Sequence, residues 1–242
     1  MVYRLPSFIR RTFAWSIKHH QTMSNTSELK VAIVGLGNIG QVLATNLTKG
    51  SRPVILAARD LSKAESLAQN LDSLAQPMAI EVALQEADII ILAIWFASIK
   101  EFLTQYASQL EGKIIIDPSN PIAPNDKGGF DKIIGETESA GEINASLLPK
   151  GATLAKAFGT LGAASLANAA GQTPDQVVLF YATDDQRIDS DVEKLIVDAG
   201  FEPLRVGGLD QSIRLEVFGE LHEFGALGRT VTAQEVQDVV IA

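Results

Sequence analysis

The ten residues VAIVGLGNIG, from Val31 to Gly40, decide how this sequence is interpreted. A β-branched apolar run ends at Gly35, and Gly37 and Gly40 complete a G-x-G-x-x-G spacing. The first glycine permits a tight turn, the second lets a pyrophosphate approach the backbone, and the third lets a helix pack close to the strand. The N–H groups and positive end of that helix favour phosphate groups. A glycine-rich turn without a ligand is the alternative.

Strand and helix signals alternate along the chain that follows this turn. The predicted strands are residues 30–34, 53–58, 88–94, 113–116, 154–158, 177–181 and 202–206. The predicted helices are residues 39–50, 62–71, 99–106, 191–199 and 211–224, with Ser62 and Glu65 in the spacing of a capping box and residues 118–129 as a loop. This rhythm predicts an α/β fold, a Rossmann-type doubly wound parallel sheet. We expect a nucleotide-binding domain at residues 28–165 and a small C-terminal α/β portion at 166–242, packed on it.

Composition and charge exclude several classes of protein. The chain has 242 residues, a net charge of −9 and no cysteine, so disulfides and thiolate chemistry are excluded. An acidic protein lacks the basic footprint that nucleic acids require. The longest apolar run, Ile89 to Ala97, is too short to span a bilayer, which takes about 20 residues. We therefore expect a cytoplasmic protein that binds no nucleic acid, has no stable membrane insertion and contains no metal site.

The N-terminal tail, residues 1–27, differs from the rest of the chain. It carries four basic residues and no acid, so the remaining residues have a net charge of about −13 once those four charges are subtracted from −9. Its mixture of basic and apolar side chains resembles a targeting or membrane-surface segment. The alternative is a non-native or disordered extension, with the natural start at Met23. The tail is excluded from the fold prediction.

The end of the second predicted strand indicates which dinucleotide binds. NAD sites place an acid there to hold the ribose 2′-hydroxyl. Here Ala58 leaves room, Arg59 can contact a 2′-phosphate with two N–H groups, and Lys63 adds a second cation. Asp60 would favour NAD if its carboxylate faced the ribose, but we expect it near the start of the next helix, where an acid is favoured. The pattern favours NADP(H).

Six motifs in order then resemble one known family. They are VAIVGLGNIG, AARDLSKAE, DIIILAIWF, DPSNP, KAFGTLGA and GGLDQSIRLE, within residues 29–224. They resemble the NADPH:coenzyme F-420 oxidoreductase family, which includes the NADP-binding domains of membrane metalloreductases. The resemblance implies hydride transfer between NADPH and a deazaflavin or flavin, coenzyme F-420 or a flavin as co-substrate, and a homodimer.

The resemblance also implies roles for individual residues. At the pyrophosphate, the matching positions are Leu36, Gly37, Asn38 and Ile39, between Gly35 and Gly40. At the 2′-phosphate they are Ala58, Arg59 and Lys63. Phe96 matches a position along the cofactor, and Asn120 and Ala163 match positions beside the nicotinamide. Two alternatives stay open. Trp95 and Phe96 can instead be core aromatics at a strand end, and Asn120 can belong to a simple turn.

The acceptor side of the site departs from the family. Members that reduce deazaflavin have a histidine where this chain has Gly159, which is expected to leave a hole beside the nicotinamide. His222 is expected to be packed, and Lys156 to be a solvated residue flanking a strand. No Tyr/Lys or His/Asp pair suited to proton transfer is found, so no catalytic residue is assigned. A reductase of small carbonyl or imine substrates and a non-catalytic NADP(H) sensor are the alternative functions.

Overall fold

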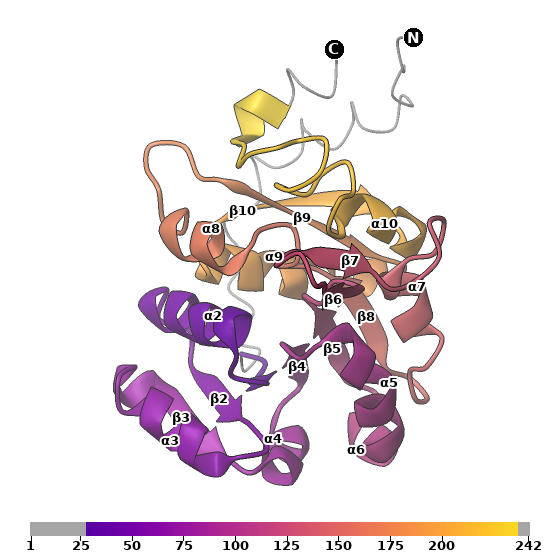
Figure 1. Ribbon diagram of the computed structural model, residues 1–242. Helices are drawn as coiled ribbons and strands as arrows, with labels where there is room; N and C mark the ends of the chain where they lie inside the picture. The colour runs from indigo at the N-terminus through magenta and orange to yellow at the C-terminus, as the bar shows by residue number, and fades with distance from the viewer. Residues whose placement is uncertain (1–27, 237–242) are drawn as a thin grey trace, which may run out of the picture.

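The chain folds around one twisted eight-stranded sheet flanked by helices (Figure 1). The computed structural model describes residues 28–236, so the predicted N-terminal tail lies outside the described residues. The strand order is β10-β9-β8-β5-β4-β1-β2-β3. The strands are β1 Val31–Val34, β2 Val54–Ala57, β3 Ala75–Met78, β4 Ile89–Leu92, β5 Ile114–Asp117, β8 Thr153–Lys156, β9 Val178–Thr183 and β10 Glu202–Gly207.

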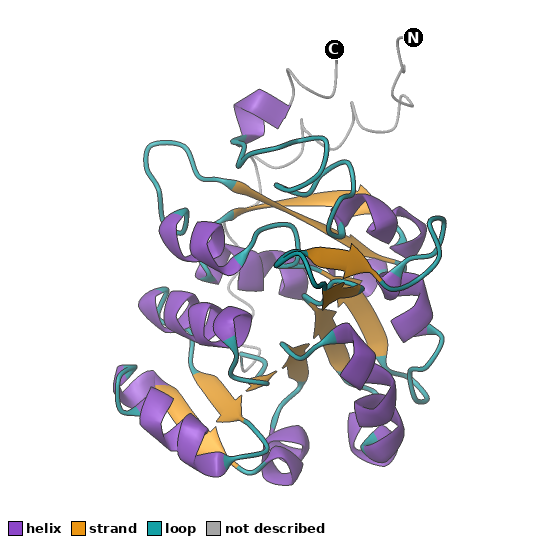
Figure 2. Cartoon of the chain, in the orientation of Figure 1, coloured by secondary structure: helices purple, strands orange, loops and turns teal. Residues whose placement is uncertain are grey.

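Helices cover both faces of this sheet, as Figure 2 shows. Side chains of β1 alternate between two apolar clusters, because successive residues of a strand point to opposite faces. One face is covered by α2 Asn38–Lys49, α3 Leu61–Ala68, α8 Ala163–Asn168 and α9 Asp189–Asp198. The other is covered by α4 Ile80–Glu86, α5 Phe96–Gln105, α6 Ala107–Leu110 and α7 Ala140–Ala145. No helix in residues 28–236 is both long and apolar enough to cross a membrane.

The direction of the strands confirms the predicted fold class and refines it. Strands β1 to β5 and β8 run parallel, with the order reversing between β1 and β4, as in doubly wound nucleotide-binding sheets. Strand β9 pairs antiparallel with β8, and β10 runs parallel to β9. The last two strands therefore extend the same sheet. The division at residue 165 stays a prediction.

Two predictions of local structure are wrong. Residues 118–129 are not all loop, because β6 (Ile122–Pro124) pairs antiparallel with β7 (Phe130–Lys132) in a hairpin. The predicted helix 211–224 is confined to α10, Ser212–Leu215, which follows the short turn η3, Leu209–Gln211. Residues 216–225 instead form turns that we call the C-terminal segment. The short helical turns η1 (Asp72–Leu74) and η2 (Gln186–Ile188) complete the described elements.

Candidate cofactor-binding site

The glycine turn has the geometry that a bound pyrophosphate requires. Gly35 adopts φ +93°, and its N–H donates to the Ala57 carbonyl at 2.9 Å. A Cβ at Gly35 would lie 2.5 Å from the Ala93 carbonyl oxygen, and a Cβ at Gly40 would overlap the Gly35 carbonyl. Both positions therefore need glycine. No atom lies within 4 Å of a Cβ added at Gly37, so that side of the turn is open.

The N-terminus of α2 points its free N–H groups toward this open side. Gly37 is the N-cap, no side chain caps the helix, and its first turn carries no acid. The backbone N–H of Gln41 makes the first bond of the helical ladder, to the Gly37 carbonyl at 3.0 Å. The Leu36 side chain is buried in the core, and that of Ile39 is half-buried, whereas Asn38 is exposed. Leu36 can therefore offer a ligand only its backbone.

The end of β2 leaves two cations available to a 2′-phosphate. Arg59 and Lys63 are exposed, and no described side chain or carbonyl engages either side chain. Asp60 is the N-cap of α3, because its Oδ1 accepts from the Ser62 N–H at 3.1 Å and from the Ser62 hydroxyl at 2.7 Å. The hydroxyl bond, helped by the backbone bond, lowers the pKa of Asp60. The predicted capping box at Ser62 is therefore wrong, and Asp60 caps the helix.

The segment after β4 carries two aromatic residues near the carboxyl end of that strand. Phe96 is the first residue of α5 and is half-buried. Trp95, its N-cap, leaves 57% of its surface exposed, so the interpretation of Trp95 as a core aromatic is wrong. Its ring contacts that of Phe130 on β7. This partner could not be predicted, because the hairpin that carries Phe130 was predicted as a loop.

Asn120 connects three segments and is more than part of a turn. Its amide Nδ2 donates to the Gly159 carbonyl at 3.0 Å, and its Oδ1 accepts from the Val217 N–H at 2.7 Å. The loop after β5, the turn after β8 and the C-terminal segment are therefore held together at the carboxyl edge of the sheet. The amide of Asn120 thus fixes the relative position of these three segments.

The turn at Gly159 is filled where the sequence predicted a hole. A Cβ at Gly159 would lie 2.9 Å from the Pro118 carbonyl oxygen, so the hole predicted in place of the family histidine is wrong. His222 is buried behind this turn, with its Nδ1 accepting from the Phe224 N–H at 3.0 Å. Burial lowers the pKa of His222 to about 4, against the opposing effects of Glu223 and the Gly159 carbonyl. His222 is packed, as predicted, and neutral at physiological pH.

Ala163 lies beside the point where the C-terminal segment closes on the site. It is half-buried and begins α8, whose N-cap is Gly162. The Glu223 carboxylate accepts from the Gly162 N–H, and the Glu223 N–H donates to the Thr160 carbonyl at 3.1 Å. Sequence reasoning missed Glu223, because its partner is 61 residues away along the chain. The segment is thus fixed to the turn at both its main chain and its side chain.

Lys156 is not the solvated lysine that the sequence predicted. Its side chain is 2% exposed, and its Nζ forms an ion pair with Asp117 Oδ2 at 3.1 Å and donates to the Ser119 carbonyl. Asp117 also accepts from the Asn144 amide at 2.9 Å and from the Ser119 N–H at 2.8 Å. This buried network joins the ends of β5 and β8 and fixes the loop that leads to Asn120.

Two buried hydroxyls beside this network have no hydrogen-bond partner. Ser119 Oγ and Thr160 Oγ1 flank Asn120 and Gly159 in sequence, and both residues are buried. Buried polar groups are normally satisfied, so these two suit a ligand at the carboxyl edge. Together with the open Gly37 side and the two free cations, they fit a dinucleotide that crosses the edge from β2 to β8. The sequence analysis included Ser119 only as a member of the DPSNP motif and assigned it no role.

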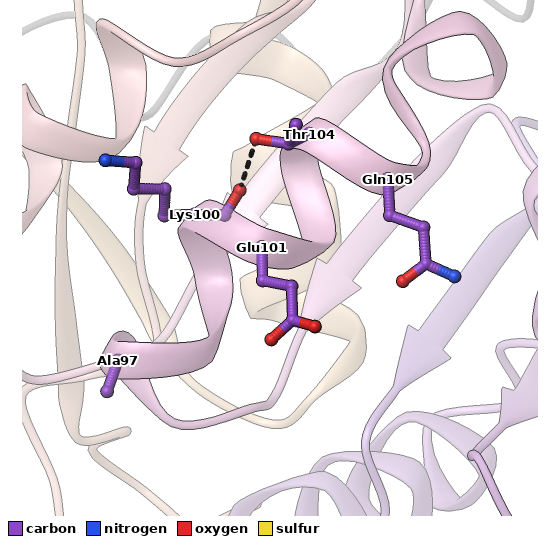
Figure 3. A pocket seen from close by; sticks show the side chains of 5 residues that line it. All are labelled: Ala97, Lys100, Glu101, Thr104 and Gln105. Carbon is purple, nitrogen blue, oxygen red and sulfur yellow. Dashed lines mark hydrogen bonds between the residues drawn. The ribbon is translucent and has the colours of Figure 1, made fainter.

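A shallow hollow of about 470 Å³ lies elsewhere, on α5 (Figure 3). It is lined by Ala97, Lys100, Glu101, Thr104 and Gln105, whose side chains in Figure 3 come from one helix. The buried residues of α5 lie on its other face. The hollow is the polar surface of an amphipathic helix and takes no part in the site. Residues 28–236 contain no cluster of histidine, aspartate and glutamate that would suit a metal ion.

Comparison with known proteins shows which proteins the chain resembles. Residues 30–121 match the family described as NADP oxidoreductase coenzyme F420-dependent. Over 187 residues, covering 77% of this chain and 36% of the relative, it is 29% identical to the metalloreductase STEAP3 of Rattus norvegicus. It is also 29% identical to the F420-dependent NADP reductase of Methanothermobacter marburgensis, over 59% of this chain and 68% of that protein.

Residues 30–121 are thus similar to the coenzyme F420-dependent NADP oxidoreductase family. A solved structure agrees across most of the fold. The hypothetical protein SMa0349 from Sinorhizobium meliloti is similar with a TM-score of 0.74 and 30% identity, over 85% of this chain and 96% of that one. The relatives named for an activity are a metalloreductase and an NADP reductase, so the similarity is to oxidoreductases. The chain spans about a third of the length of STEAP3.

Proposed function

We propose that the protein transfers hydride between NADPH and a deazaflavin or flavin-type ring. The observation that supports this proposal concerns Lys156, the one candidate proton donor beside the KAFGT turn. Its side chain is buried and bound to Asp117 and the Ser119 carbonyl. A reductase of small carbonyls normally needs a proton donor beside the substrate oxygen. A ring acceptor takes both electrons with the hydride and needs only one proton, which solvent supplies, so positioning suffices.

The chain's own residues would supply binding and orientation. The α2 N-terminus and the Gly37 side would receive the pyrophosphate, and Arg59 and Lys63 the 2′-phosphate. Ala58, Phe96 and Ala163 would border the bound nucleotide. Asn120 would hold the walls of the nicotinamide region at a fixed distance. NADPH, when bound, supplies the hydride. That the protein is a cytoplasmic homodimer stays a prediction.

Acceptor specificity tests the proposal directly. We expect NADPH oxidation with deazaflavin, FMN or FAD and none with a panel of small aldehydes, ketones and imines, followed by the absorbance of NADPH. Robust turnover of a small carbonyl by the unchanged protein would contradict the proposal and favour the carbonyl reductase. Tight NADPH binding without turnover of any acceptor would favour the sensor.

Choice of cofactor is a second expected outcome. Hydrogen bonds from Arg59 to a 2′-phosphate, with help from Lys63, should favour NADPH over NADH by about 2–3 kcal/mol. Calorimetric titration should therefore show at least tenfold tighter binding of NADPH, and Arg59→Ala should remove most of the difference. Arg187→Ala, at an exposed arginine beside Asp185, is the matched control and should leave the preference unchanged. Equal affinities in the unchanged protein would contradict the assignment.

A further inference from the structure

Exposed aromatic side chains gather on a few segments of this protein. In residues 28–236 the exposed aromatics are Trp95, Phe130, Phe218 and Phe224. Trp95 and Phe130 are 57% and 46% exposed, and their ring centroids lie 6.4 Å apart with planes inclined by 37°. We call these two residues the aromatic pair. The two rings form one exposed aromatic surface, and aromatic side chains are the groups on which planar ligands stack.

The aromatic pair lies on segments that border the nicotinamide region. Trp95 follows β4, and a Cβ at Gly35 would lie 2.6 Å from Ile94, so this segment packs against the glycine turn. Phe130 is carried by the hairpin whose first strand begins two residues after Asn120. In doubly wound sheets, ligands bind outside the carboxyl ends of the strands, where the order reverses. That point lies between β1 and β4 here.

We propose that the aromatic pair is the stacking surface for the planar ring of the hydride acceptor. This inference rests on the proposed function and names where its second substrate binds. Aromatic side chains stack on planar π-systems largely independently of their substituents, so one surface can accept a flavin or a deazaflavin. A ring held there would lie at the same carboxyl edge of the sheet as the proposed nicotinamide, where the two rings could meet face to face for hydride transfer.

The size of the pair favours a small ring over a second copy of the chain. Two partly exposed rings offer on the order of 200 Å², whereas a stable interface buries about 800 Å² on each partner. Exposed Lys127 and Asp131 are neighbours of Phe130 in the sequence of the hairpin, and exposed Ile133 follows them. A planar ring matches the size of a two-ring surface better than a second protein does.

Kinetics and binding test the aromatic pair separately. Trp95→Ala and Phe130→Ala should each raise the KM for FMN or deazaflavin roughly tenfold, with NADPH affinity changed less than twofold. Trp95→Tyr, which retains an aromatic face, should stay within about threefold of the unchanged protein. Val197→Ala is the matched control, because Val197 is an exposed apolar residue, 51% exposed, on α9 next to Asp198 at the opposite end of α2.

Fluorescence gives a readout that needs no turnover. The chain has two tryptophans, so Trp15→Phe in the full-length protein leaves Trp95 as the only one. FMN or riboflavin should quench its emission saturably, and equilibrium dialysis should show the same affinity, weakened roughly tenfold by Phe130→Ala.

The outcomes separate this inference from the proposed function. Absence of turnover with every acceptor, despite ring binding at Trp95, would contradict the proposed function and leave the stacking surface supported. Normal turnover with unchanged KM and ring affinity in both alanine variants would overturn the stacking surface alone. A change of sedimenting mass in these variants, with unchanged ring affinity, would make the pair an interface between copies and would equally overturn it.

Discussion

Lys156→Met is expected to lower the free energy of unfolding by about 3–5 kcal/mol, because it leaves the Asp117 carboxylate buried without its cation. Both side chains are almost inaccessible to water, so solvent cannot replace the missing partner. Urea denaturation at neutral pH, followed by circular dichroism, measures the change. For a chain of this length the melting temperature should fall by roughly 10 °C.

A matched lysine at an exposed pair provides the control for this experiment. Lys30 pairs with Glu86 at 2.7 Å, but both side chains are about half exposed. Lys30→Met should therefore cost less than about 1 kcal/mol. Adding Asp117→Asn to Lys156→Met should recover part of the loss, since it removes the unpaired charge. Similar small losses for both single variants would show that the Lys156 pair is not buried in solution.

Gly37→Ala and Gly40→Ala are expected to fail in different ways. Gly37 has φ −79° and open space around a Cβ, so its alanine variant should fold with stability unchanged within about 0.5 kcal/mol. The added methyl group occupies the side on which a pyrophosphate approaches, so NADPH affinity should fall at least tenfold. A Cβ at Gly40 instead overlaps the Gly35 carbonyl, which should cost about 1–3 kcal/mol of stability as well as NADPH binding.

Thermal unfolding and calorimetric titration of the two variants distinguish these effects. Gly128→Ala is not a suitable control, because that residue has φ +79° and any side chain there is strained. The two variants serve as controls for each other, because Gly37 and Gly40 lie in the same motif and each variant adds one methyl group. Unchanged NADPH affinity in Gly37→Ala would show that the pyrophosphate does not cross this side of the turn.

The nucleotide half of the site was predictable because its signals are local. Gly35, Gly37 and Gly40 lie in one turn, where the backbone requires glycine at Gly35 and Gly40 and Gly37 leaves one side open. Arg59 and Asp60 follow the next strand, where the helix start explains the acid without a ligand. Strand and helix periodicity likewise predicted most of the parallel sheet, because strands covered on both faces are continuous apolar runs.

Strand β3 was missed because it lacks this signal. It lies at the edge of the sheet, its residues Gln76 and Pro77 are exposed, and proline within a short run argues against a strand. An edge position removes that objection, because a proline needs no ladder hydrogen bond on the solvent side. Edge strands of this kind carry too few apolar residues for periodicity to detect them.

The helix predicted over residues 211–224 failed for a different reason. Its apolar residues have helical spacing, but the Glu216 carboxylate accepts from the Gly141 N–H at 3.1 Å, which directs the chain away from a helix. Added Cβ atoms at Gly219 and Gly225 would overlap nearby carbonyls, so both glycines serve close turns. Lys156 was misjudged similarly, because its partner Asp117 is 39 residues away and no spacing reveals such a pair.

The bonds made by Asn120 also bear on the order in which parts of the site form while the chain is being synthesised. Its Val217 partner lies 97 residues further along the chain, whereas the glycine turn and Arg59 are sequence neighbours. Contacts of large sequence separation are slow to form, because a long loop must close first. We expect a chain still on the ribosome to complete its nucleotide cradle before its acceptor side. NADPH can then stabilise the unfinished protein by mass action before the bonds of Asn120 fix the walls of the neighbouring region.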